Sequence, residues 1–139
     1  MRRLAFALLA AVSIAACGGS DGATAPAGAP VAGTYLLQSM DGVAMPAVYF
    51  VADDYRFDVT GGSFALNADL TYRVALDMRY VGVAGVSDAP AQEFEHGTYT
   101  VSGSVVTLSS DAGGTMSATL SNSVLTMRMD GLSFVYRKP

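Results

Sequence analysis

Residues 70–80 alternate between apolar and polar side chains. The apolar positions of this segment are Leu70, Tyr72, Val74, Leu76, Met78 and Tyr80. Successive side chains of an extended strand point to opposite faces, so a period of two gathers the apolar groups on one face. A helix would spread the same side chains around its circumference. The segment is therefore predicted to be a strand with one buried and one solvated face.

The same alternation recurs along most of the chain, interrupted by residues that favour turns. Strands are predicted at 33–40, 44–52, 55–60, 63–67, 70–80, 95–102, 104–109, 115–120, 124–129 and 132–137. Asp41-Gly42, Gly61-Gly62 and Asp130-Gly131 are read as turns between strands. Asp-Gly is the strongest of these signals, because both central residues of a type I′ turn need a positive φ.

Short strands joined by tight turns predict an all-β fold, an antiparallel up-and-down meander that closes into a barrel of eight to ten strands. Closure removes the exposed strand edges that invite aggregation. An eight-stranded barrel has an interior just wide enough to be filled by side chains or to hold one small ligand.

The N-terminus has the pattern of an export signal. Met1–Arg3 is short and positive, and Leu4–Ala16 is apolar except for Ser13. A spanning helix needs about 20 apolar residues, so this run is too short to cross a bilayer. Residues 1–16 are therefore predicted to be a signal-peptide helix.

Ile14-Ala15-Ala16-Cys17 resembles the lipobox of bacterial lipoprotein precursors. That resemblance implies cleavage before Cys17, lipidation of its thiol and acylation of its new amino group, so that the lipid joins the protein to a membrane. The absence of an aspartate at position 18 implies, by the same resemblance, a lipid-anchored protein of the cell envelope at the outer membrane. Ordinary secretory cleavage that leaves Cys17 as a free thiol is the alternative.

Residues 17–32 are predicted to be the lipidated cysteine and a flexible, disordered linker. The segment is rich in Gly, Ala and Pro and has no aromatic residue. Such a segment cannot bury enough apolar surface to offset the entropy lost on ordering. The chain thus divides into a signal peptide (1–16), a linker (17–32) and a β-barrel domain (33–139).

The barrel domain resembles the lipocalin-like lipoproteins of environmental bacteria. The resemblance lies in Gly33-Thr34-Tyr35, Ser39–Gly42, Phe64–Tyr72, Gly97-Thr98-Tyr99 and Phe134–Arg137. Lipocalins open with a tryptophan where this chain has Tyr35. The resemblance implies a lipocalin-like barrel that carries a small apolar ligand.

Charge and composition exclude several classes of function. The chain holds 12 acidic and eight basic residues, for a formal net charge of −4, so no nucleic-acid partner is expected. One cysteine and one histidine cannot form a disulfide or the common zinc sites. We therefore expect no metal and no cofactor.

No enzymatic activity is expected, because no serine or cysteine has a recognisable base beside it. His96 is expected to face solvent or to make a local hydrogen bond. Glu93 and Glu95 share one face of a strand and are expected to be solvated.

Aromatic and methionine side chains on the predicted inner face are the candidates for ligand binding. They are Tyr72, Met78, Tyr80, Tyr99, Phe134 and Tyr136, with Met116, Met127 and Met129 also predicted to face inward. These side chains could line an apolar pocket, or they could fill the barrel. The two readings correspond to a lipoprotein that binds a small apolar ligand and to one with a structural or protein-interaction role.

Val81–Gln92, which lacks a clear period, is predicted to be either a flap over the barrel mouth or the tip of a long hairpin.

Overall fold

The computed structural model describes residues 30–82 and 89–139. These residues form ten strands, β1 (Gly33–Met40), β2 (Val43–Ala44), β3 (Ala47–Val51), β4 (Tyr55–Leu66), β5 (Thr71–Gly82), β6 (Ala89–Ser102), β7 (Val105–Ser110), β8 (Thr115–Ser121), β9 (Val124–Met129) and β10 (Leu132–Arg137). In this part of the chain there is no helix that is long and apolar enough to span a membrane.

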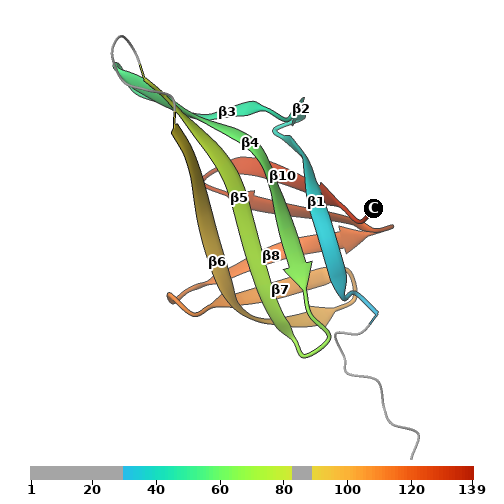
Figure 1. Ribbon diagram of the computed structural model, residues 1–139. Coiled ribbons are helices and arrows are strands. Elements are labelled where there is room, and N and C mark those ends of the chain that lie inside the picture. The colour runs from blue at the N-terminus through green and yellow to red at the C-terminus, as the bar shows by residue number, and fades with distance from the viewer. Residues whose placement is uncertain (1–29, 83–88) are drawn as a thin grey trace, which may run out of the picture.

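Eight of the strands form a closed antiparallel barrel (Figure 1). Strands β4 to β10 pair consecutively, and β1 closes the ring by pairing with β10 through Leu36–Met40 and with β4 through Gly33–Leu36. The predicted all-β meander that closes into a barrel is therefore confirmed. The predicted signal peptide and most of the predicted linker lie outside the described residues.

Strands β2 and β3 are additions at the seam between β1 and β4. β2 pairs with Ser39 and Met40 of β1, and β3 pairs with the first half of β4. The prediction of a single strand over 44–52 is wrong, because the pairing is interrupted between Ala44 and Ala47. Pro46 lies in this interruption. Because proline has no backbone N–H, it cannot donate a hydrogen bond to a neighbouring strand.

Strand β4 runs without a break through Gly61-Gly62, so the predicted turn there, and with it the division into strands 55–60 and 63–67, is wrong. A Cβ atom on Gly62 would lie 2.6 Å from the carbonyl oxygen of Ala75 on the neighbouring strand. Gly62 therefore allows the backbones of β4 and β5 to approach closely and does not form a turn. The register of this pair shifts nearby, between Val59 and Gly61.

Strands β5 and β6 form a long hairpin. Val81–Gln92 has no clear strand pattern in the sequence, yet both of its ends belong to strands. Val81 and Gly82 are the last residues of β5, and Ala89–Gln92 are the first residues of β6. The two ends of Val81–Gln92 therefore agree with the predicted long hairpin. Residues 83–88 lie outside the described part of the chain. The free ends of β3 to β6 project beyond the barrel, at the end opposite to the start of β1 (Figure 1).

The core lies inside the barrel and is rich in aromatic rings. Its buried members are Tyr35, Leu37, Met40, Ala47, Val59, Phe64, Leu66, Tyr72, Val74, Leu76, Met78, Tyr99, Val106, Leu108, Ala118, Leu125, Met127, Phe134 and Tyr136. Phe64 is at its centre, stacked on Tyr72 at 5.9 Å and edge-on to Tyr136 at 5.6 Å between ring centroids. On β5, Tyr72, Val74, Leu76 and Met78 all face this core, as the alternation predicts.

Tyr136 contributes a buried hydroxyl group with no hydrogen-bond partner among the described residues. An unsatisfied buried donor costs about 1–3 kcal/mol. We therefore expect Tyr136→Phe to raise the free energy of unfolding by about 1 kcal/mol in urea titrations, since it removes the hydroxyl and keeps the ring.

Tyr99→Phe is the matched control for this change. The Tyr99 hydroxyl donates to the carbonyl oxygen of Asn67 at 2.7 Å, so its removal should lower the free energy of unfolding by about 1 kcal/mol. Equal destabilisation by both substitutions would contradict the burial of an unpaired Tyr136 hydroxyl.

Candidate functional site

The wall of the barrel has an opening between β6 and the hairpin of β7 and β8. β6 pairs with β7 only from Gly97 to Ser102, and the carbonyl oxygen of His96 accepts a hydrogen bond of 3.1 Å from the Asp111 N–H. Its residues from Ala89 to Glu95 pair with β5 alone. The ladder between β8 and β9 begins at Ala118 and Met127, so Met129 lies beyond it. These unpaired stretches leave an opening in the wall that reaches the apolar interior.

A pocket with a volume of about 450 Å³ occupies this opening. Its lining comes from β5, β6, the β7–β8 hairpin and β9, and consists of Val74, Leu76, Glu93, Phe94, Glu95, Ser110, Ala112, Gly113, Gly114, Thr115, Met116, Met127 and Met129. This volume is within the range of about 300–1,000 Å³ that is usual for small-molecule sites.

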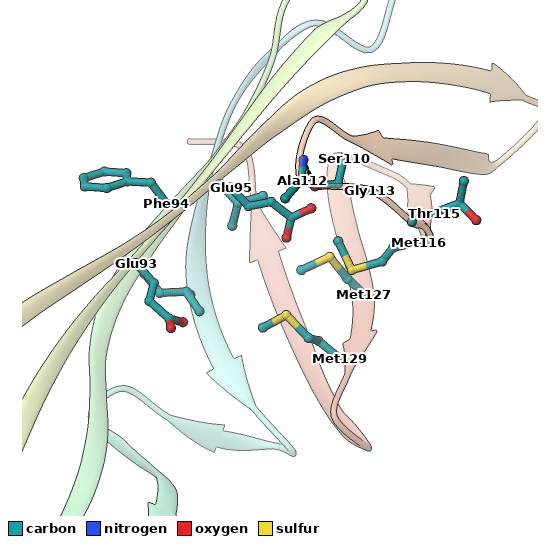
Figure 2. A pocket seen from close by; sticks show the side chains of 13 residues that line it. Glu93, Phe94, Glu95, Ser110, Ala112, Gly113, Thr115, Met116, Met127 and Met129 are labelled. Atoms are coloured by element: carbon teal, nitrogen blue, oxygen red, sulfur yellow. Dashed lines mark hydrogen bonds between the residues drawn. The ribbon is translucent and has the colours of Figure 1, made fainter.

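The deeper part of the pocket is apolar. Val74, Leu76 and Met127 are buried, while Met116 and Met129 are half-buried and pack against the core. Figure 2 shows the thioether groups of Met116, Met127 and Met129 on the side of β6 that carries Glu93 and Glu95. Methionine is unbranched and polarizable, so these side chains can adapt to ligands of different shape.

Two carboxylates supply the charge of the pocket. Glu95 is half-buried and its Oε1 accepts a hydrogen bond of 2.6 Å from the Tyr72 hydroxyl. Burial, together with this hydrogen bond and the negative charge of Glu95, raises the pKa of Tyr72. Glu93 is exposed and has no hydrogen-bond or ion-pair partner among the described residues. Phe94, between them, points to the opposite side of β6 (Figure 2), where the guanidinium group of Arg73 lies 4.6 Å from its ring centre.

Five of the six predicted ligand-binding residues lie in the core. Tyr72, Met78, Tyr99, Phe134 and Tyr136 are all buried, and none of them is part of the pocket lining formed by the described residues. Tyr72 is linked to the pocket through Glu95. The inward prediction for Met127 is confirmed, and Met116 and Met129 are half-buried beside it.

Tyr80 was predicted to face inward; it lies on the inward face of β5 but outside the core. Tyr80 belongs to an aromatic cluster with Tyr55 and Phe57, to which its ring centroid lies 5.4 Å and 5.3 Å away. It is on the same face of β5 as Met78, but at the part of the strand near Gly82, where it pairs with Phe57 and with Ala89 of β6. The alternation gives the correct face of the strand but not the point at which the strand leaves the core.

His96 is exposed, with its Nε2 3.5 Å from a carboxylate oxygen of Asp111. This agrees with the prediction of a solvent-facing histidine. It borders a second hollow of about 490 Å³, lined mostly by the exposed side chains around Phe94 and Asp111. No group of three or more His, Cys, Asp or Glu side chains able to hold a metal is found within the described ranges.

The tyrosines make stability sensitive to alkaline pH. Burial raises the pKa of Tyr35, Tyr72, Tyr99 and Tyr136, and burial with the Asp130 hydrogen bond raises the pKa of Tyr49 to about 12. The unfolded chain releases these protons near pH 10, earlier than the folded chain, so unfolding becomes more favourable as pH rises above that value.

We therefore expect the free energy of unfolding to fall between pH 10 and pH 12, with tyrosinate absorbance appearing as the chain unfolds. Tyr49→Phe, which lacks one of the titrating groups, should show a smaller fall. A free energy of unfolding that stays constant over this range would contradict the burial of the tyrosines.

Comparison with known proteins adds no assignment: no family model, no curated protein and no solved structure matches the chain.

Proposed function

We propose that this chain is a lipid-anchored protein of the bacterial cell envelope that binds a small ligand through an apolar group held in the pocket beside β6. The pocket carries this proposal. Its depth is formed by Val74, Leu76 and methionine side chains, and its mouth is open beside the part of β6 that does not pair with β7. Removing an apolar group from water into such a site contributes about 25 cal/mol per Å² of buried surface.

The lipid anchor is the second part of the proposal. The lipobox-like sequence ending at Cys17 supports it, because the only cysteine of the chain is at the expected cleavage point. Several acyl chains hold a protein to a membrane far more stably than one. The residue after Cys17 is Gly18. In the lipoproteins that the N-terminus resembles, an aspartate at this position keeps the protein in the inner membrane, so its absence supports an outer-membrane location.

The anchor is tested by the mass and location of the full chain made in a bacterium. Wild-type protein should fractionate with membranes and carry acyl groups on residue 17, whereas Cys17→Ser should carry none and should keep residues 1–16. An unmodified Cys17 in the membrane-free fraction would overturn the anchoring proposal without affecting the barrel.

Ligand binding is tested with octanol, a neutral amphiphile, on the full chain carrying Cys17→Ser, which cannot be lipidated at residue 17. Saturation-transfer NMR should show octanol bound. Ala112→Trp places a large ring at the pocket lining and should weaken binding about tenfold or more, equivalent to about 1.4 kcal/mol. Thr119→Trp, at an exposed position on β8 outside the pocket, is the matched control and should bind as the parent does.

A structural or protein-interaction role with a filled barrel is the alternative. The ring packing of Phe64, Tyr72 and Tyr136 favours it, because these side chains occupy the barrel interior where a ligand would sit in an open barrel. Absence of octanol binding, or equal binding by the Ala112→Trp and Thr119→Trp variants, would favour this role over ligand binding in the pocket.

A further inference from the structure

Both glutamates of the chain line the same pocket. The sequence contains ten aspartates but only Glu93 and Glu95 as glutamates, and both contribute to the lining. They are two residues apart on β6, so they share the face that looks into the opening. Figure 2 shows their carboxylates on the side of β6 where the three methionines lie, with Phe94 on the other side.

The charge of these carboxylates is not balanced by the pocket. The lining contributed by the described residues includes no Lys, Arg or His side chain. Glu95 is held by the Tyr72 hydroxyl through Oε1, a neutral donor that fixes the orientation of the carboxylate and leaves its charge in place. The pocket therefore combines an apolar depth with two negative charges at its mouth.

From this combination we infer that the pocket selects amphipathic cations, molecules with an apolar chain or ring and one protonated or quaternary amine. The inference rests on the proposed function and specifies its ligand class. The apolar part would contact Val74, Leu76 and the methionines, and the cationic group would lie between Glu93 and Glu95. A fatty acid or another anionic amphiphile would bring a like charge to the mouth and be disfavoured.

The glutamates have a competing explanation in the edge of β6. Residues Ala89–Glu95 have no ladder partner on the β7 side, and charged side chains that point inward are a known protection against pairing of such edges between molecules. This explanation requires self-association when the charges are removed, and it does not require any preference for a cationic ligand. The two explanations therefore differ in what they predict for binding.

The test compares octylammonium, octanol and octanoate, which share the apolar chain and differ in the charge of the head group. Titration calorimetry on the full chain with Cys17→Ser is expected to give octylammonium about tenfold tighter binding than octanol, with octanoate the weakest, because each partly exposed ion pair contributes a few-fold. Glu93→Gln with Glu95→Gln should bring octylammonium to the affinity of octanol and leave octanol nearly unchanged.

Asp53→Asn with Asp54→Asn is the matched control. It removes the same number of negative charges from exposed positions that are not part of the pocket, so the preference for octylammonium should persist. Loss of the preference in this control would mean that it follows net charge, and would overturn the inference.

The remaining outcomes separate the inference from the function on which it rests. If octanol binds and octylammonium binds no tighter, the inference fails and the ligand-binding function stands. If the double glutamine variant self-associates but keeps the preference for octylammonium, the glutamates protect the strand edge and the inference fails. If none of the three compounds binds, the proposed ligand-binding function fails as well.

Discussion

Gly97→Ala is expected to destabilise the barrel by about 3 kcal/mol, the upper end of the usual effect of adding a methyl group to a packed interior. Gly97 is buried where β6 first pairs with β7, opposite Ser110. A Cβ atom at this position would clash with the carbonyl oxygen of Ser109 and would lie 3.0 Å from the ring of Tyr72. Backbone cannot move away as a flexible side chain can, so the two strands must separate.

Gly61→Ala is the control for this prediction. Gly61 also lies inside a strand, but the nearest atom to an added Cβ is a carboxylate oxygen of Asp77 at 3.5 Å, an ordinary contact. Its free energy of unfolding in urea should change by less than about 0.5 kcal/mol. Equal stability of the Gly97→Ala and Gly61→Ala variants would show that β6 and β7 are not paired in the register described.

Phe64→Ala is expected to cost about 3–5 kcal/mol, a large part of the roughly 5–15 kcal/mol that stabilises a domain of ordinary size. Phe64 is fully buried and its ring contacts Tyr72 of β5 and Tyr136 of β10. Truncation removes apolar contacts and leaves a cavity that the closed wall cannot collapse to fill.

Phe94→Ala is the matched substitution on the outside of the barrel. Phe94 is 52% exposed, and the guanidinium group of Arg73 lies 4.6 Å from its ring centre. Its loss should cost about 1 kcal/mol or less in the same urea titration, the usual contribution of an exposed cation–π pair. A cost for Phe94→Ala as large as that for Phe64→Ala would contradict the assignment of inside and outside.

The regular strands could be predicted from the sequence because burial imposes a period of two on them. Strand β5 is an example, since Tyr72, Val74, Leu76 and Met78 each face a continuous core. The predicted strand boundaries were wrong where a glycine or a proline has a role other than forming a turn. Gly62 permits close approach of β4 to β5, and Pro46 interrupts the segment that became β2 and β3.

The pocket could be predicted from the sequence only in part. Its apolar side chains were predicted to face inward, but the alternation could not show which part of the interior is filled and which is open. That depends on where β6 stops pairing with β7, a property of the closed sheet. Glu93 and Glu95 were expected to be solvated, because the first half of β6 has few apolar residues to reveal its inner face. The regular spacing of the two glutamates was the only available signal.

The most direct test of the account is NMR of the full chain with Cys17→Ser, labelled on the methionine methyl groups and saturated with octylammonium. If the apolar group enters the pocket beside β6, nuclear Overhauser effects should connect the octyl protons to the methyl groups of Met116, Met127 and Met129. Met40 and Met45, which do not line the pocket, should show none. Octyl contacts to Met40 and Met45 alone, or to no methionine at all, would contradict the central claim.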